Sequence, residues 1–372
     1  MSKLFQPLDV AGSHLQHRMV MAPLTRFRAD DDYVPMDIVR EYYTQRASVP
    51  GTLILTEATQ ISRRAIGAKN APGIWSPEQI ASWRKITDAV HAKGSYIWCQ
   101  LWCLGRASDP ALRRELGLKF VSASDVPSSP DGEAPEPLTE EEILQLIEDY
   151  RTAARNAMEA GFDGVEFHGA NGYLPDQFLQ DVSNKRTDRW GGSIENRARF
   201  HLEATKAIIN EVGADKTAVR LSPWSDFGGM GMADPVPTFT YVVEQLRDLN
   251  VAFIDLVEAR IRGNDDADCG GDKDVSPFVH AWGKDKPIFI GGGFNPETAR
   301  KAIDETYKDY KLAVIFGRSW TSNPDLPFRV KKDIPLVKYD RGSFYIPKSS
   351  TGYTDWEFSE EFKATDGAAR AA

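Results

Sequence analysis

The sequence predicts a (β/α)8 barrel, and three observations support that fold. Eight short runs along the 372 residues are apolar throughout, which is typical of strands buried on both faces. Helical patterns separate these runs, as a parallel sheet requires. The surplus over the ~250 residues of a typical barrel lies in two loops and a C-terminal extension. We therefore expect one domain over residues 1–372, with loop insertions at 104–137 and 260–274 and a disordered tail at 357–372.

The expected strands are rich in β-branched and aromatic residues. They are Met19–Leu24, Thr52–Thr59, Tyr96–Trp102, Gly164–His168, Thr217–Leu221, Ala252–Val257, Pro287–Gly291 and Leu312–Gly317.

The expected helices carry start and stop signals in the sequence. Ser76-Pro77-Glu78 begins a helix that runs to Ala92, because proline favours the first turn and Gly94 follows the end. Thr139 and Glu142 have the spacing of a capping box, which predicts a helix to Ala160. The others are Asp37–Ala47, Ile194–Val212, Thr238–Leu249, Asp274–Trp282 and Pro296–Tyr307.

Composition excludes several classes of function. Hydrophobic residues make up 41% and charged residues 27%, as in soluble globular proteins. The net charge of −9 disfavours a nucleic-acid or anionic-membrane partner. No apolar run approaches the roughly 20 residues that span a bilayer, and the N-terminus lacks the pattern of a signal peptide. With three cysteines, an odd number, we expect a reducing compartment, and the cytoplasm is the expected location.

Three polar residues stand together where chemistry collects in such barrels, at the C-terminal end of a strand. His168 ends the fourth strand, and Asn171 and Tyr173 follow within five residues. A lone histidine after a strand is more often a packing residue than a catalyst. An imidazole, an amide and a phenol on one loop can instead bind an oxygen atom and deliver a proton to a neighbouring carbon.

The ends of the last two strands favour an anionic ligand. Gly292, Gly293 and Gly317 let backbone N–H groups approach a phosphate, and Arg318 adds charge. Gln100 and Arg220 are polar residues within apolar strands and need partners. For Arg220 we expect an ion pair with Glu57 or Glu166. Together with Thr25, such a mouth suits a flat heteroaromatic such as flavin mononucleotide (FMN), although spacing alone excludes no other cofactor.

Ordered motifs covering nearly the whole chain resemble the old yellow enzymes, flavin-dependent ene-reductases of the (β/α)8 class, and in particular fungal members. The motifs are Met21-Ala22-Pro23-Leu24-Thr25-Arg26, Asn70-Ala71-Pro72-Gly73-Ile74-Trp75, Gln100-Leu101-Trp102, His168-Gly169-Ala170-Asn171-Gly172-Tyr173-Leu174, Thr187 to Arg197, Val219-Arg220-Leu221-Ser222-Pro223, Phe316-Gly317-Arg318, Ser322 to Leu326 and Tyr339 to Tyr345. One departure is Gly292-Gly293, where many relatives carry Gly-Asn.

The resemblance implies non-covalently bound FMN, with NADPH as reductant and no metal. The implied cofactor-binding residues are Pro23, Thr25, Ala58, Gln100, Arg220, Gly292, Gly293, Gly317 and Arg318. The implied substrate-binding residues are His168, Asn171, Trp102, Phe227 and Tyr345, with Phe344 beside Tyr345. The expected substrate is a small enone, enal or nitroalkene. Relatives range from monomers to larger oligomers, so we expect a monomer or a homodimer.

The mechanism implied by the resemblance reduces an activated C=C bond by hydride transfer from the flavin. His168 and Asn171 bind the substrate oxygen, and Tyr173 protonates the α-carbon. An alternative is a specialised biosynthetic flavoenzyme that reduces or isomerises an alkaloid or other secondary-metabolite enal. The retained Tyr173 weighs against isomerisation, because a proton donor favours net reduction. A third hypothesis, a flavin-binding barrel with a regulatory or structural role, leaves the chemical groups at the strand ends unexplained.

Overall fold

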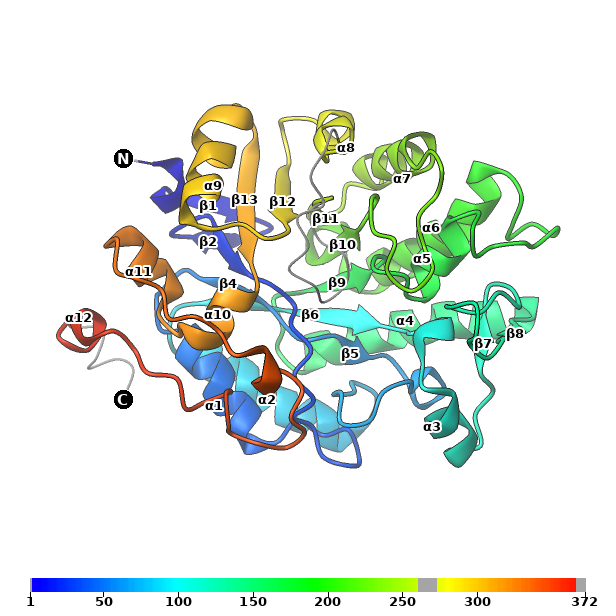
Figure 1. Cartoon of the computed structure of the whole chain (residues 1–372), viewed down its shortest axis with the longest axis horizontal. Coiled ribbons are helices and arrows are strands. Elements are labelled where there is room, and N and C mark those ends of the chain that lie inside the picture. The colour runs from blue at the N-terminus through cyan, green and yellow to red at the C-terminus, as the bar shows by residue number, and fades with distance from the viewer. Residues whose placement is uncertain (1, 260–272, 366–372) are drawn as a thin grey trace.

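A closed parallel barrel forms the centre of the molecule (Figure 1). The computed structural model describes residues 2–259 and 273–365. Within these residues the barrel strands are β3 (Met19–Met21), β4 (Leu53–Leu55), β6 (Tyr96–Trp102), β9 (Gly164–His168), β10 (Thr217–Leu221), β11 (Phe253–Val257), β12 (Pro287–Gly291) and β13 (Lys311–Phe316). Each pairs in parallel with the next along the chain, and β13 pairs with β3 to close the ring. The predicted (β/α)8 fold is confirmed.

Helices surround the barrel, and most begin where the sequence predicts. Ser76 and Gln79 form a capping box at the start of α2 (Pro77–His91), and Thr139 and Glu142 form another at α4 (Glu140–Glu159). The other barrel-covering helices are α1 (Asp37–Arg46), α6 (Ile194–Val212), α7 (Val236–Asp248), α8 (Ser276–Trp282) and α9 (Pro296–Lys301). Of these, α7 begins at Val236 instead of Thr238 and α8 at Ser276 instead of Asp274. The helix expected to run from Pro296 to Tyr307 is divided, because a π-helical turn, η5 (Ala302–Thr306), follows α9.

The N-terminal end of the barrel is closed by a hairpin that the sequence analysis did not predict. Strands β1 (Leu8–Val10) and β2 (Ser13–Leu15) pair antiparallel. Leu8, Val10 and Leu15 pack with side chains of the barrel interior, among them Trp98 and Phe253. This end is therefore an apolar floor, which leaves the C-terminal end of the barrel for polar side chains.

The predicted loop insertion at 104–137 contains short elements. These are η3 (Gly105–Ala107), α3 (Pro110–Glu115), β7 (Val121–Ser122) and β8 (Glu136–Pro137). Strand β5 (Thr59–Gln60) extends the sheet beside the end of β6. Of the second predicted insertion, at 260–274, residues 260–272 lie outside the described residues, and so does Cys269.

The expectation of a disordered tail over 357–372 is wrong for its first part. Helix α12 (Glu360–Lys363) buries Phe362, whose ring lies 5.2 Å from that of Phe328 on α11 (Leu326–Lys331). Ser359 donates both its backbone N–H and its hydroxyl to Asp325. An aromatic contact and a buried carboxylate thus hold this segment, while residues 366–372 lie outside the described part.

Residues 343–353, which we call the C-terminal strap, are held by three buried arginines. Arg26 donates to the carbonyls of Phe344 (3.0 Å) and Gly352 (2.8 Å), and Arg28 donates to that of Ser343 (3.0 Å). Arg46 donates to the carbonyl of Tyr353 at 3.0 Å. Backbone carbonyls satisfy most of these donors, which makes the burial of three guanidinium groups tolerable. The strap is thereby fixed across the chain that follows β3.

Candidate active site

The predicted site residues gather at the C-terminal ends of the barrel strands, as expected for this fold. The side chains with the most evident chemistry end adjacent strands: Trp102 ends β6, His168 ends β9, and Arg220 lies opposite His168 in the register of β9 with β10. Pro23 and Thr25 follow β3, Ala58 follows β4, Gly292 and Gly293 follow β12, and Gly317 and Arg318 follow β13. All these residues therefore lie at one end of the barrel.

The turn after β9 has a backbone that depends on glycine at two positions. A Cβ on Gly169 would lie 2.2 Å from His201 Nε2, and one on Gly172 would lie 2.8 Å from the carbonyl oxygen of Phe227. Asn171, between them, has φ of 56°, a left-handed conformation that asparagine tolerates better than most residues. Its N–H donates to Ser222 Oγ at 2.7 Å, which ties the turn to the end of β10.

Tyr173 lies between two aromatic walls. Its ring centroid is 4.8 Å from that of His168 and 5.0 Å from that of Trp102, and it meets both nearly perpendicularly, at 80° and 89°. Ala58 packs in the same small apolar cluster as Trp102. Tyr173 also caps helix α5 (Leu174–Leu179), so its backbone is fixed as well as its ring.

His168 is a neutral imidazole. Burial lowers its pKa well below the usual range, and the positive charge of Arg220 lowers it further. The N–H of Ala170 approaches His168 Nδ1 at 3.4 Å, which favours the tautomer that carries its proton on Nε2. In that tautomer, His168 can donate a hydrogen bond from Nε2 at neutral pH.

Tyr173 keeps its proton across the neutral range. Burial raises the pKa of its phenol to about 12, and the nearby Tyr345 raises it too, while Arg220 opposes them. A phenol with such a pKa is a weak acid, so it donates its proton only to a strongly basic centre such as a developing enolate.

Arg220 has a different partner from the one expected. Neither Glu57 nor Glu166 pairs with it; its Nη1 donates to Asp255 Oδ2 on the adjacent strand β11 at 2.8 Å. Glu166 instead accepts from Gln100 Nε2 at 2.7 Å. The signal for Asp255 was present in the sequence, since a carboxylate stands within the apolar run Ala252–Val257.

Aromatic side chains form the rim of the mouth. Tyr345 and Phe227 are 43% and 39% exposed, which is unusual for large apolar side chains. The ring of Tyr345 lies 5.6 Å from that of Phe27. The C-terminal strap thus brings Tyr345 beside the segment after β3, and its influence on the pKa of Tyr173 places it near that phenol.

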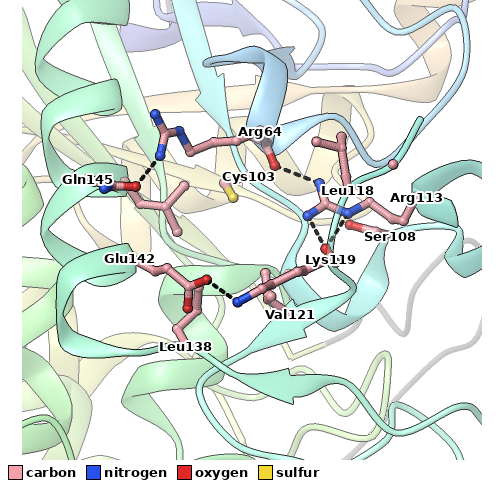
Figure 2. Close-up of a pocket in the computed structure, with 14 residues that line it drawn as sticks. Arg64, Cys103, Ser108, Arg113, Leu118, Lys119, Val121, Leu138, Glu142 and Gln145 are labelled. Atoms are coloured by element: carbon pink, nitrogen blue, oxygen red, sulfur yellow. Dashed lines mark hydrogen bonds and ion pairs between the residues drawn. The ribbon is translucent and has the colours of Figure 1, made fainter.

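A cavity lies away from the barrel mouth. Figure 2 shows this space of about 260 Å³, which lies between α4 and the inserted segment after β6. Cys103 is buried in its wall, and burial raises the pKa of the thiol to about 12. Lys119 pairs with Glu142, and Arg113 donates to backbone carbonyls. The charged groups in this wall are thus engaged within the protein.

Comparison with known proteins identifies a flavin-dependent oxidoreductase of the barrel type. The model of the NADH:flavin oxidoreductase / NADH oxidase family matches residues 3–337, and the chain belongs to that family. Within it, the chain is an old yellow enzyme of the fungal type, as the sequence motifs predicted.

Solved structures and curated relatives agree with this assignment. Old yellow enzyme from Pichia sp. AKU4542 superimposes with a TM-score of 0.89 and 38% identity, covering 96% of this chain and 94% of that one. A chanoclavine-I aldehyde reductase of Penicillium roqueforti is 54% identical over 99% of this chain and all of that protein. A probable inactive reductase of Epichloe festucae var. lolii is 52% identical over 97% of this chain and 96% of that protein.

The residues at the mouth fit FMN, the cofactor that this family implies. Arg220 Nε is buried without a hydrogen-bond partner among the described residues, so a donor remains for a polar ligand edge. Gly292 has φ of 137°, and a Cβ there would lie 2.7 Å from Glu258 Cβ. Gly293, with φ of 69°, has a conformation that glycine and asparagine share, so the Gly-Asn pattern expected from the resemblance is compatible with this backbone. The fit to FMN therefore rests on Arg220 Nε, while the contact at Gly292 shows that this loop packs closely against Glu258.

Replacing Gly292 by alanine is expected to weaken FMN binding. The substitution forces both an unfavourable φ and a contact with Glu258, and strain of about 1–3 kcal/mol would displace the loop. If that strain falls on the bound form, the FMN dissociation constant rises about tenfold or more. Titration of the apoprotein with FMN, followed by flavin fluorescence, measures the FMN dissociation constant. Gly283→Ala is the matched control, because Gly283 has φ of 90° but open space at its Cβ position. Equal constants for Gly292→Ala and Gly283→Ala would contradict the prediction.

Proposed function

We propose that this protein uses NADPH to reduce the activated C=C bond of α,β-unsaturated aldehydes, ketones or nitro compounds. The observation that carries the proposal is the position of Tyr173, a protonated phenol 4.8 Å from the neutral ring of His168. The names of two relatives support it: one is a chanoclavine-I aldehyde reductase, and one from Aspergillus flavus is an NADP-dependent oxidoreductase.

In the proposed reaction, two residues bind the substrate oxygen. His168 Nε2 donates one hydrogen bond, and the Asn171 side-chain amide donates a second. Both bonds draw electron density toward the oxygen and make the β-carbon electrophilic. Tyr173 then gives its proton to the α-carbon. FMN, when bound, supplies the hydride that it has received from NADPH.

The proposed cofactor contacts divide between the two ends of FMN. Gln100, Arg220 and Thr25 would hold the polar edge of the flavin ring, with Pro23 and Ala58 against it. Gly292, Gly293, Gly317 and Arg318 would hold the phosphate. Trp102, Phe227 and Tyr345 would shape the substrate pocket. We also propose a single domain, active as a monomer or a homodimer in the cytoplasm. No helix in the described residues is long and apolar enough to cross a membrane.

An anaerobic titration tests the proposal as a whole. NADPH is added to the FMN-loaded protein until the oxidised-flavin absorbance bleaches, and 2-cyclohexenone is then added. We expect the absorbance to return as the enone is reduced. If the flavin bleaches and stays bleached, simple ene-reduction is wrong. If no flavin absorbance appears after reconstitution, the cofactor assignment is wrong.

A second candidate function stays open because of the names of several relatives. Several relatives about 50% identical are named as probable inactive reductases or dehydrogenases, among them proteins of Claviceps and Epichloe. A specialised biosynthetic role on an alkaloid or secondary-metabolite enal, by reduction or by redox-neutral isomerisation, is compatible with such relatives. Conversion of an enal without net NADPH consumption would favour isomerisation.

A further inference from the structure

Two carboxyl groups face each other in the barrel just below the mouth. Glu166 and Asp255 are fully buried and lie within reach of a side-chain hydrogen bond that forms when one of them is protonated. They are the middle members of a chain that begins at Gln100 and ends at Arg220. The four side chains come from the consecutive strands β6, β9, β11 and β10, so this chain crosses one side of the barrel.

The contacts of the two acids leave one oxygen of each without a donor. Glu166 Oε2 accepts from Gln100, and Asp255 Oδ2 accepts from Arg220. The remaining oxygens, Glu166 Oε1 and Asp255 Oδ1, are buried and have no donor among the described residues. Two ionised carboxylates cannot hydrogen-bond to each other, and their charges would repel strongly in this buried setting. One proton shared by the two acids would remove this repulsion and supply the missing donor.

The proton is assigned to Glu166, because Asp255 is the acid that pairs with Arg220, whereas Glu166 accepts from the neutral amide of Gln100. Burial raises the pKa of Glu166, and the charge of Asp255 raises it further. Burial also raises the pKa of Asp255, and the neighbouring Arg220 opposes that shift. A protonated Glu166 can then donate to Asp255.

No other charge in the described barrel interior offsets the pair. Arg220 on β10 is the facing cation, His168 on β9 is neutral, and Gln100 on β6 contributes an amide. The interior side chains of the remaining strands are apolar: Val20, Leu53, Leu55, Phe289, Ala313 and Ile315. The protonated pair and Arg220 thus sum to zero charge, whereas the fully ionised pair would leave a net negative charge below the mouth.

We propose that Glu166 and Asp255 share one proton and act as positioning residues for Arg220. The protonation state of the pair sets how much of the positive charge of Arg220 acts on bound FMN. The pair thereby sets the midpoint potential of the flavin and the pH dependence of that potential. The inference rests on the FMN binding in the proposed function. Two-electron reduction adds negative charge to the flavin near Arg220, which favours retention of the shared proton. The pair therefore has a higher pKa beside reduced flavin than beside oxidised flavin. At pH values between these two pKa values, each two-electron reduction takes up one extra proton from water.

Midpoint potentials of the FMN-loaded protein test this without NADPH or enone. Reductive titration is followed by flavin absorbance between about pH 6 and about pH 10. Glu166→Gln mimics the protonated form permanently, because its amide can donate to Asp255 as the acid does. We expect Glu166→Gln to match the wild-type potential near neutral pH and to lack the extra proton uptake, and hence the steeper slope, at alkaline pH, because burial raises the pKa of Glu166.

Asp255→Asn makes the opposite change. It removes the anion beside Arg220, so at pH values where Glu166 stays protonated the uncompensated guanidinium should raise the potential. Asp325→Asn is the structural control, since it breaks another buried pair, with Arg329 at 2.7 Å, outside the barrel. That control is expected to lower thermal stability without moving the potential.

Several results would overturn the proposal. One is an identical pH slope for wild type and Glu166→Gln, and another is an Asp255→Asn potential equal to that of wild type. If Asp255→Asn does not fold, the Glu166→Gln profile alone decides. If the protein reduces no enone but its midpoint potentials show the predicted pH slopes, the proposed function is wrong and this inference holds.

Discussion

Tyr173→Phe is expected to slow the reduction of ordinary enones by about 10²–10⁴-fold, the range typical of losing a positioned general acid. Phenylalanine keeps the ring that packs between His168 and Trp102, so the pocket should retain its shape. The step in which NADPH reduces the flavin involves no phenol proton and should keep its rate. Stopped-flow absorbance measures the two half-reactions separately.

The pKa of Tyr173 adds a condition to that expectation. Because it is raised to about 12, the wild-type enone half-reaction should not lose its proton donor anywhere in the neutral range. Tyr96→Phe is the matched control, since its hydroxyl accepts from His14 at the opposite end of the barrel. An unchanged enone rate in Tyr173→Phe would remove this phenol from the mechanism.

His168→Ala is expected to lower kcat/KM for an enone by about 10²–10³-fold, as for loss of one donor to a developing oxyanion. The physical reason is the loss of the Nε2 donor, which the contact between Nδ1 and the Ala170 N–H keeps in place. The cavity left beside Tyr173 adds to the effect by loosening the ring. Steady-state kinetics with 2-cyclohexenone measure the loss.

The same measurement tests the protonation state of His168. Its pKa lies well below the usual range, so the imidazole stays neutral and wild-type kcat/KM should show no histidine ionisation near pH 6.5. His14→Ala is the control, because His14 lies on β2 at the floor of the barrel. A wild-type profile that falls as an imidazole with ordinary pKa titrates would contradict this account of the site.

The barrel was predictable because its strands are buried on both faces. Two strands have the bounds that their apolar runs predicted, namely Gly164–His168 and Thr217–Leu221. The last residues of these two strands include the predicted site residues His168 and Arg220. Helix starts were predictable for a similar reason, since the capping boxes at Ser76 and Thr139 are local in sequence. Signals that depend only on neighbouring residues can be read from the sequence alone.

Features that depend on distant partners were not predictable. The β1–β2 hairpin has strands of three residues, which are too short for a periodic signal. The hairpin is stabilised by packing its apolar side chains against those of the barrel interior. Asp255 is opposite Arg220 only because of the register between β10 and β11. Phe362 looked like part of a polar tail until the contact with Phe328 was known.

The C-terminal strap has a consequence for the synthesis of the protein. Its carbonyls are bound by Arg26, Arg28 and Arg46, which are translated among the first residues, whereas the strap is translated near the end. Until then, these arginines lack several of the carbonyl groups that make their burial tolerable. A nascent chain can complete its barrel mouth only after nearly all of it has been made. Translation products that end before the strap should therefore expose these arginines to solvent.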